Sequence, residues 1–127
     1  MLYALLIYEN AEELTTDPEA QARHAAEFGE FVAGVADKLR GGAPLKLPEH
    51  ATTIRVREGE TITTDGPFAE TKEVLGGFFL VELDNLDEAL AAAAKIPVAK
   101  YGAIEVRPVA TEIMEMVNEE SGGQHPM

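Results

Sequence analysis

The sequence contains no cysteine and no tryptophan, and acidic residues greatly outnumber basic ones. Without cysteine the chain forms no disulfide and offers neither a thiol nucleophile nor a thiolate metal ligand, which fits a reducing compartment such as the cytoplasm. Ten Lys and Arg against 23 Asp and Glu give a formal net charge of −13, which repels phosphate backbones and anionic membrane surfaces. We therefore expect no direct nucleic-acid partner.

Long apolar runs are also missing. The apolar stretch at residues 2–8 has no basic leader and is too short for a signal peptide or a membrane span. We expect a cytoplasmic protein that does not associate with membranes. A length of 127 residues is enough for one domain with its own core, and too short for two ordinary ones.

What remains is a pattern of alternating strands and helices. Tyr3 to Tyr8 and Gly77 to Leu83 are short apolar runs that predict buried strands. Thr16-Asp17-Pro18-Glu19 predicts the start of a long helix, because it combines cap residues, a proline at the first helical position and an acid in the first turn. Gly41-Gly42 predicts the end of that helix.

The second half of the chain continues the pattern. Residues 52–58 alternate as a strand does, and Gly59-Glu60 predicts a turn into a second strand at 61–64. Asn85 to Glu88 has the pattern of a capping box and predicts the start of an alanine-rich helix, which runs to about Lys95. Residues 103–109 supply the last strand.

The resulting order, β-α-β(β)-β-α-β, predicts an α+β protein with a ferredoxin-like split βαβ sheet and two helices on one face. Both central strands are apolar on both faces, so the second face needs a cover. A second copy of the chain is the simplest cover, and a homodimer is expected. An apolar ligand cavity, or a layer formed by the C-terminal segment, is the alternative. Residues 111–120 are expected to form a short helix, followed by a frayed tail at 121–127.

One segment concentrates ionisable side chains next to a turn: Asp65-Gly-Pro-Phe-Ala-Glu-Thr-Lys-Glu73. Gly66-Pro67 ends the preceding strand, and the next clear strand starts near Gly76, so the connection is longer than a hairpin needs. Long loops of this kind often carry function. The alternative is a turn capped by Asp65 and followed by solvated charges.

This segment resembles the signature of the DGPF proteins, which belong to the YCII-related family of small bacterial proteins. Further stretches resemble the family in the same order: residues 1–8, 51–56, 76–78, 87–89 and 105–109. The resemblance covers residues 1–110, taken as the domain, and leaves 111–127 as a C-terminal extension. It implies a ferredoxin-like fold, a dimeric α/β-barrel assembly and a biochemical role that is unsettled for most members.

His24 is the first candidate for chemistry. The series His24, Phe28, Phe31, Val35, Leu39 recurs at helical spacing, which turns the histidine towards the apolar side of its helix. A partly buried structural imidazole is the alternative reading. In some YCII-related proteins a helix histidine faces an aspartate, and the resemblance therefore implies His24 as a catalytic acid/base and Asp65 as its orienting carboxylate. Such chemistry needs no cofactor.

The candidate binding residues are charged or hydroxylated: Glu70, Thr71, Lys72, Glu73, Arg55 and Arg107. Arg55 and Arg57 alternate with apolar residues, so their guanidinium groups share one strand face and can clamp a carboxylate or phosphate. An exposed strand face that balances an acidic surface is the alternative. The acids of the 65–73 segment match no calcium loop, and no metal site is expected.

Two functions remain open. In the first, a dimeric, cofactor-independent enzyme binds a small polar or aromatic metabolite beside residues 65–73 and catalyses proton transfer, isomerisation or elimination. In the second, the same cleft binds a small ligand without turnover or presents a regulatory surface. The second reading agrees with the tendency of DGPF-type genes to accompany extracytoplasmic-function sigma factors. A structural interpretation makes the loop a clasp across the dimer.

Overall fold

A four-stranded antiparallel sheet lies at the centre of the structure, a computed structural model in which residues 1–122 are described. In sheet order its strands are β2 (Leu39–Pro44), β5 (Glu73–Glu82), β1 (Leu2–Asn10) and β6 (Ala103–Pro108). A separate hairpin contains β3 (Thr52–Arg57) and β4 (Glu60–Asp65). The helices are α1 (Pro18–Gly34), α2 (Leu86–Ala93) and α3 (Thr111–Glu120), with short 3₁₀ turns η1 (Ala11–Glu13), η2 (Pro48–His50) and η3 (Pro97–Lys100). This order confirms the α+β class and the ferredoxin-like sheet with β1 and β5 at its centre.

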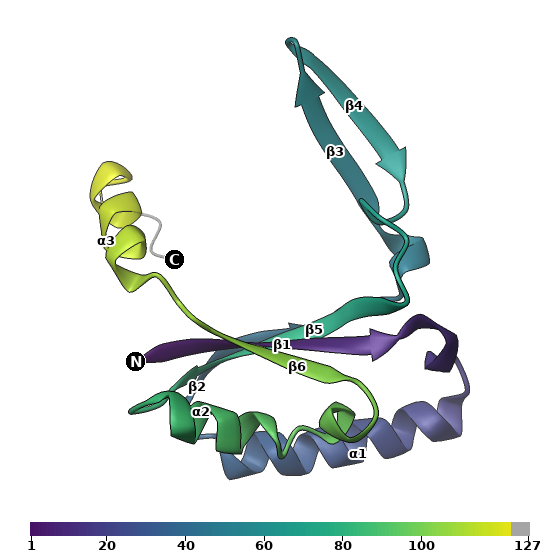
Figure 1. The fold of residues 1–127 in the computed structure, drawn as a ribbon, viewed down its shortest axis with the longest axis vertical. Helices are drawn as coiled ribbons and strands as arrows, with labels where there is room; N and C mark the ends of the chain where they lie inside the picture. Colours follow the sequence, from purple (N-terminus) through teal and green to yellow (C-terminus); the bar gives the residue numbers. More distant parts are fainter. Residues whose placement is uncertain (123–127) are drawn as a thin grey trace.

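Helices α1 and α2 cover one face of the sheet (Figure 1). Side chains of β1 alternate between the two faces, so Tyr3, Leu5 and Ile7 face the helices and are buried. They pack with Val81 of β5 and Phe31 of α1, and the cluster continues through Leu83, Ala89, Ala92, Ala93, Ile96 and Val98. Each fully buried Leu or Val contributes about 1.5–3 kcal/mol to folding. This core fixes α1 against the sheet.

The other face of the sheet carries no helix layer (Figure 1). Ala4 and Leu6 of β1 lie opposite Leu80 and Phe78 of β5, so these four apolar side chains share that face, and all four are half-buried. As the sequence predicted, both central strands are therefore apolar on both sides. We call these four residues the open face.

The first helix ends earlier than the sequence predicted. Asp17 caps it by accepting a hydrogen bond from the backbone N–H of Ala20 at 3.1 Å, as expected, but α1 ends at Gly34. The Gly41-Gly42 pair is no helix stop, because it lies within β2. Gly42 has φ +149° and a side chain there would collide with the Phe78 carbonyl, so glycine lets β2 approach β5 closely.

The hairpin also differs from its prediction. Strand β2, and not residues 52–64, completes the main sheet, and β3 and β4 pair only with each other. The turn is Glu58-Gly59, one residue earlier than expected, since Arg57 pairs with Glu60. Both turn residues have positive φ, 51° and 80°, which is the geometry of the tight turn that matches the twist of two paired strands.

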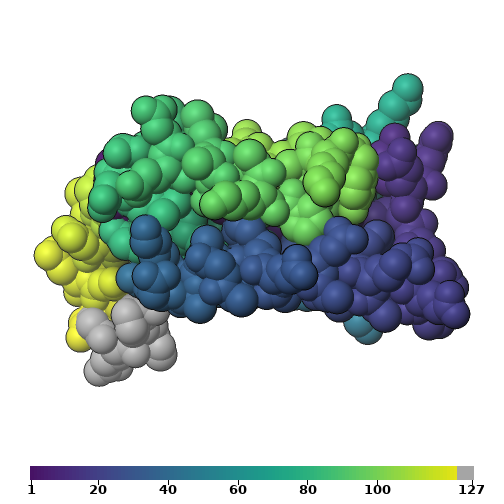
Figure 2. Space-filling view, turned by 90° about the horizontal axis from the view of Figure 1, so that it is seen from below, coloured from purple at the N-terminus to yellow at the C-terminus, as the bar shows by residue number. Residues whose placement is uncertain are grey.

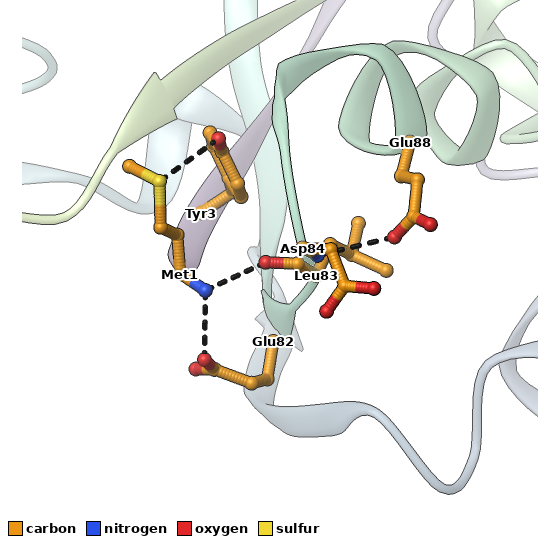
Figure 3. Close-up of polar contacts among 6 residues, drawn as sticks. All are labelled: Met1, Tyr3, Glu82, Leu83, Asp84 and Glu88. Carbon is orange, nitrogen blue, oxygen red and sulfur yellow. Dashed lines mark hydrogen bonds and ion pairs between the residues drawn. The ribbon is translucent and has the colours of Figure 1, made fainter.

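The start of α2 is held by two local hydrogen bonds, and the end of β5 just before it anchors Met1. The Asn85 side chain accepts from the N–H of Glu88 at 2.9 Å, and the Glu88 carboxylate accepts from the N–H of Asp84 at 3.1 Å. The capping function is confirmed, although Glu88 reaches Asp84 and not the cap residue itself. The Met1 amino group donates to the Leu83 carbonyl at 2.6 Å and to Glu82 at 2.9 Å (Figure 3).

Helix α3 has the predicted bounds, Thr111–Glu120. It stands away from the sheet on the open-face side (Figure 1). Of the tail predicted to fray, residues 123–127 lie outside the described part of the chain. None of the helices within residues 1–122 combines the length and apolarity needed to cross a bilayer.

Candidate functional site

Glu9 is a carboxylate placed on the helix-covered side of the sheet. It follows Tyr3, Leu5 and Ile7 at the same parity along β1, and it is half-buried. The pairing of β1 with β5 shifts at this point: Ile7 lies opposite Gly77 and Tyr8 opposite Leu75, which leaves Gly76 as an extra residue. Such a bulge re-aims neighbouring side chains.

Gly76 makes the room that Glu9 occupies. A Cβ atom at Gly76 would collide with the Glu9 carboxylate oxygen Oε2. The carbonyl of Gly76 accepts a hydrogen bond from the N–H of Leu45 at 2.9 Å, which ties the bulge to the chain after β2. The bulge has a glycine at its extra position, and the missing side chain there leaves room for the Glu9 carboxylate.

His24 approaches the same space from α1. The helical spacing of His24, Phe28 and Phe31 turns all three towards the sheet, as the sequence predicted, and His24 is half-buried. Leu39, the last member of the predicted series, belongs to β2 and not to the helix.

His24 and Glu9 line one cavity of about 450 Å³ between α1 and the strands β1, β2 and β5. Its walls are mainly apolar, formed by Leu14, Phe28, Val32, Leu45, Leu47 and Phe79. Thr15 and Gln21 add polar groups to the lining. No lysine or arginine is among the lining residues, all of which belong to the described chain. We call this space the His24 cavity.

The charges in the His24 cavity act on each other. Burial raises the pKa of Glu9 above its ordinary value, and the positive charge of His24 opposes that rise. A carboxyl with a raised pKa beside an imidazole is a pair suited to holding and moving a proton.

Tyr101 extends this pair. Its ring stacks on that of His24, with centroids 6.5 Å apart and planes at 27°. Burial raises the pKa of Tyr101, and the negative charges of Glu9, Glu27 and Glu13 raise it further. The phenol therefore stays protonated and available as a hydrogen-bond donor.

The structure does not bring Asp65 to His24 within one chain. Asp65 ends β4, is exposed and lies opposite Thr52 across the hairpin. No hydrogen bond or ion pair joins it to His24 among residues 1–122, and it does not line the His24 cavity. The predicted Asp65–His24 pairing stays a prediction, while the carboxylate that the fold places at His24 is Glu9.

The turn after Asp65 closes the hairpin. Gly66 has φ +100°, its N–H donates to the Ala51 carbonyl at 2.7 Å, and its carbonyl accepts from the Thr53 hydroxyl at 2.9 Å. These bonds hold the two ends of the hairpin together at its root, so the start of the 65–73 segment has a structural role.

The rest of the 65–73 segment borders a second cavity of about 650 Å³. Thr71 and Glu73 line it, together with Tyr8, His50, Phe68 and other residues near the hairpin root. The carbonyl of Lys72 accepts from the N–H of Ala11 at 2.7 Å, which ties the loop to η1. We call this space the loop cavity.

The other predicted binding residues do not gather at either cavity. Glu70 is exposed on the loop, Arg55 is exposed on β3, and Arg107 is exposed on β6 opposite Ala4. None of the three lines the His24 cavity or the loop cavity. Their role in binding stays a prediction.

A third hollow of about 560 Å³ lies on the outer surface between α1 and the segment formed by α2 and η3. Figure 2 shows this surface from below. Its rim carries charges of both signs, contributed by Glu27, Glu30, Lys38, Glu88, Lys95 and Lys100. We interpret it as the seam between packed helices, because core residues such as Phe31 and Ala92 form its floor.

Sequence reasoning found His24 but missed Glu9 and the pairing with Tyr101. The alternation of side chains along β1 could have indicated Glu9. A carboxylate that continues the series of three core residues on one face of the strand is directed towards the helix layer. The contact with Tyr101 has no comparable signal, because it joins α1 to the turn after η3 through tertiary packing.

A family model, a relative and a solved structure are similar to this chain. A family model described as "YCII-related domain" matches residues 1–113. An uncharacterized protein of Rhizobium meliloti (strain 1021) is 41% identical over 123 residues, which cover 87% of this chain and 93% of that protein. A solved structure, 5-chloro-2-hydroxyhydroquinone dehydrochlorinase from Burkholderia phenoliruptrix AC1100 in complex with 2,5-dihydroxybenzoquinone, is 15% identical. The two structures superpose with a TM-score of 0.49, and the match covers 86% of this chain and 93% of that one.

Proposed function

The chain belongs to the YCII-related domain family, and we propose that it is a homodimer that binds a small, neutral, hydroxylated aromatic metabolite and transfers a proton through His24. No cofactor takes part in this proposal. The single observation that carries it is the placement of Glu9 and His24 in one mainly apolar cavity.

The chemistry of the cavity walls supports the ligand class. Phe28 and Phe79 offer aromatic surface to a planar ring, and a volume of about 450 Å³ is within the range of small-molecule sites. The absence of lysine and arginine from the lining disfavours phosphate or carboxylate groups, whose burial needs a paired positive charge. The polar groups at Glu9 and His24 suit a hydroxyl.

The roles of the two residues follow from their protonation. As a base, the His24 imidazole takes a proton from the bound ligand and becomes positively charged. The Glu9 carboxylate then stabilises the imidazolium, and the proton returns from His24 to another ligand atom. A positioned group of this kind accelerates proton transfer by about 10²–10⁴-fold.

Asp65 remains a proposed catalytic residue, and it lies outside the His24 cavity of its own chain. The open face supports the homodimer. Ala4, Leu6, Phe78 and Leu80 form an apolar centre that no helix of the described chain covers. An isologous contact between two such faces buries both.

Isotope exchange tests the proposal. With resorcinol in deuterated buffer, NMR measures the replacement of ring protons next to the hydroxyl groups. We expect wild-type protein to accelerate exchange and His24→Ala to lose that acceleration while still binding resorcinol. Failure of the wild type to bind resorcinol at the His24 cavity would overturn the ligand class.

The alternative function is a ligand-binding module without turnover, and the loop cavity beside residues 65–73 favours it. Under this alternative, resorcinol binds but its ring protons exchange at the same rate with and without protein. Thr71→Val, in the lining of the loop cavity, would then alter affinity more than His24→Ala does.

A further inference from the structure

Two elements rise from the open-face side of the sheet at opposite ends of the molecule. The β3–β4 hairpin stands at one end and α3 at the other, with the sheet between them (Figure 1). We call them the two arms. Neither arm has extensive contacts with another helix or strand of the described chain.

Neither arm is expected to be stable without a partner. A lone two-stranded hairpin is marginal in water, and so is an isolated helix of ten residues. Both arms expose large apolar side chains: Ile54 (65%), Val56 (58%), Ile62 (45%), Ile113 (54%), Met116 (63%) and Val117 (41%). Such exposure on elements that lack their own support indicates a surface that another molecule covers.

The arms also carry unmatched charges of opposite sign. One hairpin face presents Arg55 and Arg57, with Ile62 directly opposite Arg55 and Glu60 directly opposite Arg57. Within residues 1–122 the ion pairs join only the Met1 amino group to Glu82 and Glu49 to His50, so neither arginine has a carboxylate partner. In a chain of net charge −13, these two arginines alternate along one strand and so lie on the same face of the hairpin.

Helix α3 offers the complementary surface. It contains four glutamates and no basic residue. Helical spacing places Glu112 one turn before Met116 and Glu119 one turn after it, and Glu115 lies on the same side of the helix as these two. A methionine bordered by carboxylates thus offers a surface for an isoleucine that lies beside two arginines.

We propose that the hairpin of each chain docks on α3 of a second copy, with Arg55 and Arg57 against Glu115 and Glu119 and with Ile62 against Met116. This contact rests on the proposed homodimer and specifies its geometry. A two-fold axis along the viewing direction of Figure 1, between the two open faces, sets each hairpin beside the partner's α3.

Two different two-fold axes can bring the open faces together, and the charges favour the one proposed. An axis in the plane of Figure 1, parallel to the sheet, pairs hairpin with hairpin and α3 with α3. That arrangement sets the glutamates of one α3 against those of the other, and juxtaposed like charges are unfavourable. In the arrangement proposed, the glutamates of α3 meet the two arginines of the hairpin instead.

Disulfide cross-linking tests the geometry, and the absence of native cysteine makes the result unambiguous. Ile62→Cys is produced in one chain and Met116→Cys in another that carries a mass tag. After mixing and oxidation we expect a covalent dimer of one chain of each kind, and no covalent dimer from either variant alone. Cross-linking within a single variant, or a non-covalent dimer that never cross-links in the mixture, would overturn the arm contact.

Charge reversal gives an independent readout. Arg55→Glu/Arg57→Glu and Glu115→Lys/Glu119→Lys are each expected to raise the dimer dissociation constant about tenfold at low salt. An equimolar mixture should regain wild-type affinity, since both of its contacts are again between opposite charges. Glu30→Lys, on the exposed outer side of α1, is the matched control.

The failures are distinguishable by sedimentation of the wild type. A monomer at all concentrations would overturn the homodimer and the arm contact together. A dimer that neither charge reversal weakens would leave the homodimer standing and refute the arm contact.

Discussion

The Glu9 carboxylate occupies the space that a side chain at position 76 would need, and Gly76 is the extra residue of the bulge between β1 and β5. The backbone irregularity and the half-buried acid are therefore one structural feature. It places a carboxylate at the His24 cavity, and each part of it can be changed separately.

Gly76→Ala is expected to displace Glu9 while leaving the fold intact, because the atom that the new methyl meets is the end of a flexible side chain. The affinity for phenol should fall about tenfold, or roughly 1.4 kcal/mol, near the value of one charged hydrogen bond. Isothermal calorimetry measures it. Gly34→Ala is the control: a methyl there meets nothing within 4 Å, and phenol affinity should not change.

His24→Ala should raise the pKa of Glu9 further, because it removes the positive charge that opposes the effect of burial. Carbon-detected NMR titration of the glutamate carboxylates measures this. His50→Ala, which removes a histidine outside the His24 cavity, should leave Glu9 unchanged. A Glu9 pKa that responds equally to both substitutions would contradict the pairing.

The same carboxyl makes stability depend on pH. Its folded-state pKa lies above the ordinary value of 4.5, so the folded state holds the proton longer than the unfolded state does. The contribution of Glu9 to the free energy of unfolding is present below pH 4.5 and declines as pH rises through the raised pKa. Glu9→Gln should remove this decline in urea denaturation curves, whereas an identical pH profile would show that Glu9 is not desolvated.

Asn85→Ala should destabilise the protein by about 1 kcal/mol, since the first turn of α2 loses the acceptor for the N–H of Glu88. Chemical denaturation measures the change. Asn85→Ser keeps a capping oxygen and should retain most of the stability. If the two variants were equally destabilised, the cap would not be the cause.

Gly66→Ala should weaken the root of the hairpin, because φ +100° is strained for any residue with a side chain. A loss of about 1 kcal/mol or more is expected. Hydrogen exchange at the N–H of Gly66, which donates to Ala51, localises the effect. Gly29→Ala, within α1 and with open space around it, is the control and should not destabilise.

Much of the fold could be predicted from local sequence signals. The cap at Asp17, the cap at Asn85 and the bounds of α3 depend on neighbouring residues, and all three are confirmed. Strand β2 depends on tertiary contact instead. Its Gly41-Gly42 pair resembles a helix stop, and only the close approach to β5 explains why glycines occur there.

The candidate site shows the same division between features that have a local sequence signal and features that depend on tertiary packing. Helical periodicity predicts the orientation of His24, but its neighbours are determined by how α1 crosses the sheet. The sequence makes Asp65 a candidate because it lies at a strand end beside a turn, but its strand belongs to a hairpin that stands apart from the His24 cavity. Glu9 shares the parity of the core residues on β1, and its significance emerges only once α1 is packed over it.

The most direct test of the account is to locate a bound ligand. Phenol is titrated into isotope-labelled protein, and backbone NMR shifts are mapped onto residues 1–122. The account predicts that the shifts cluster at Glu9, His24, Ala25 and Gly76, around the His24 cavity, and that they weaken in Gly76→Ala. Shifts confined to Thr53, Phe68 and Thr71, around the loop cavity, would contradict it.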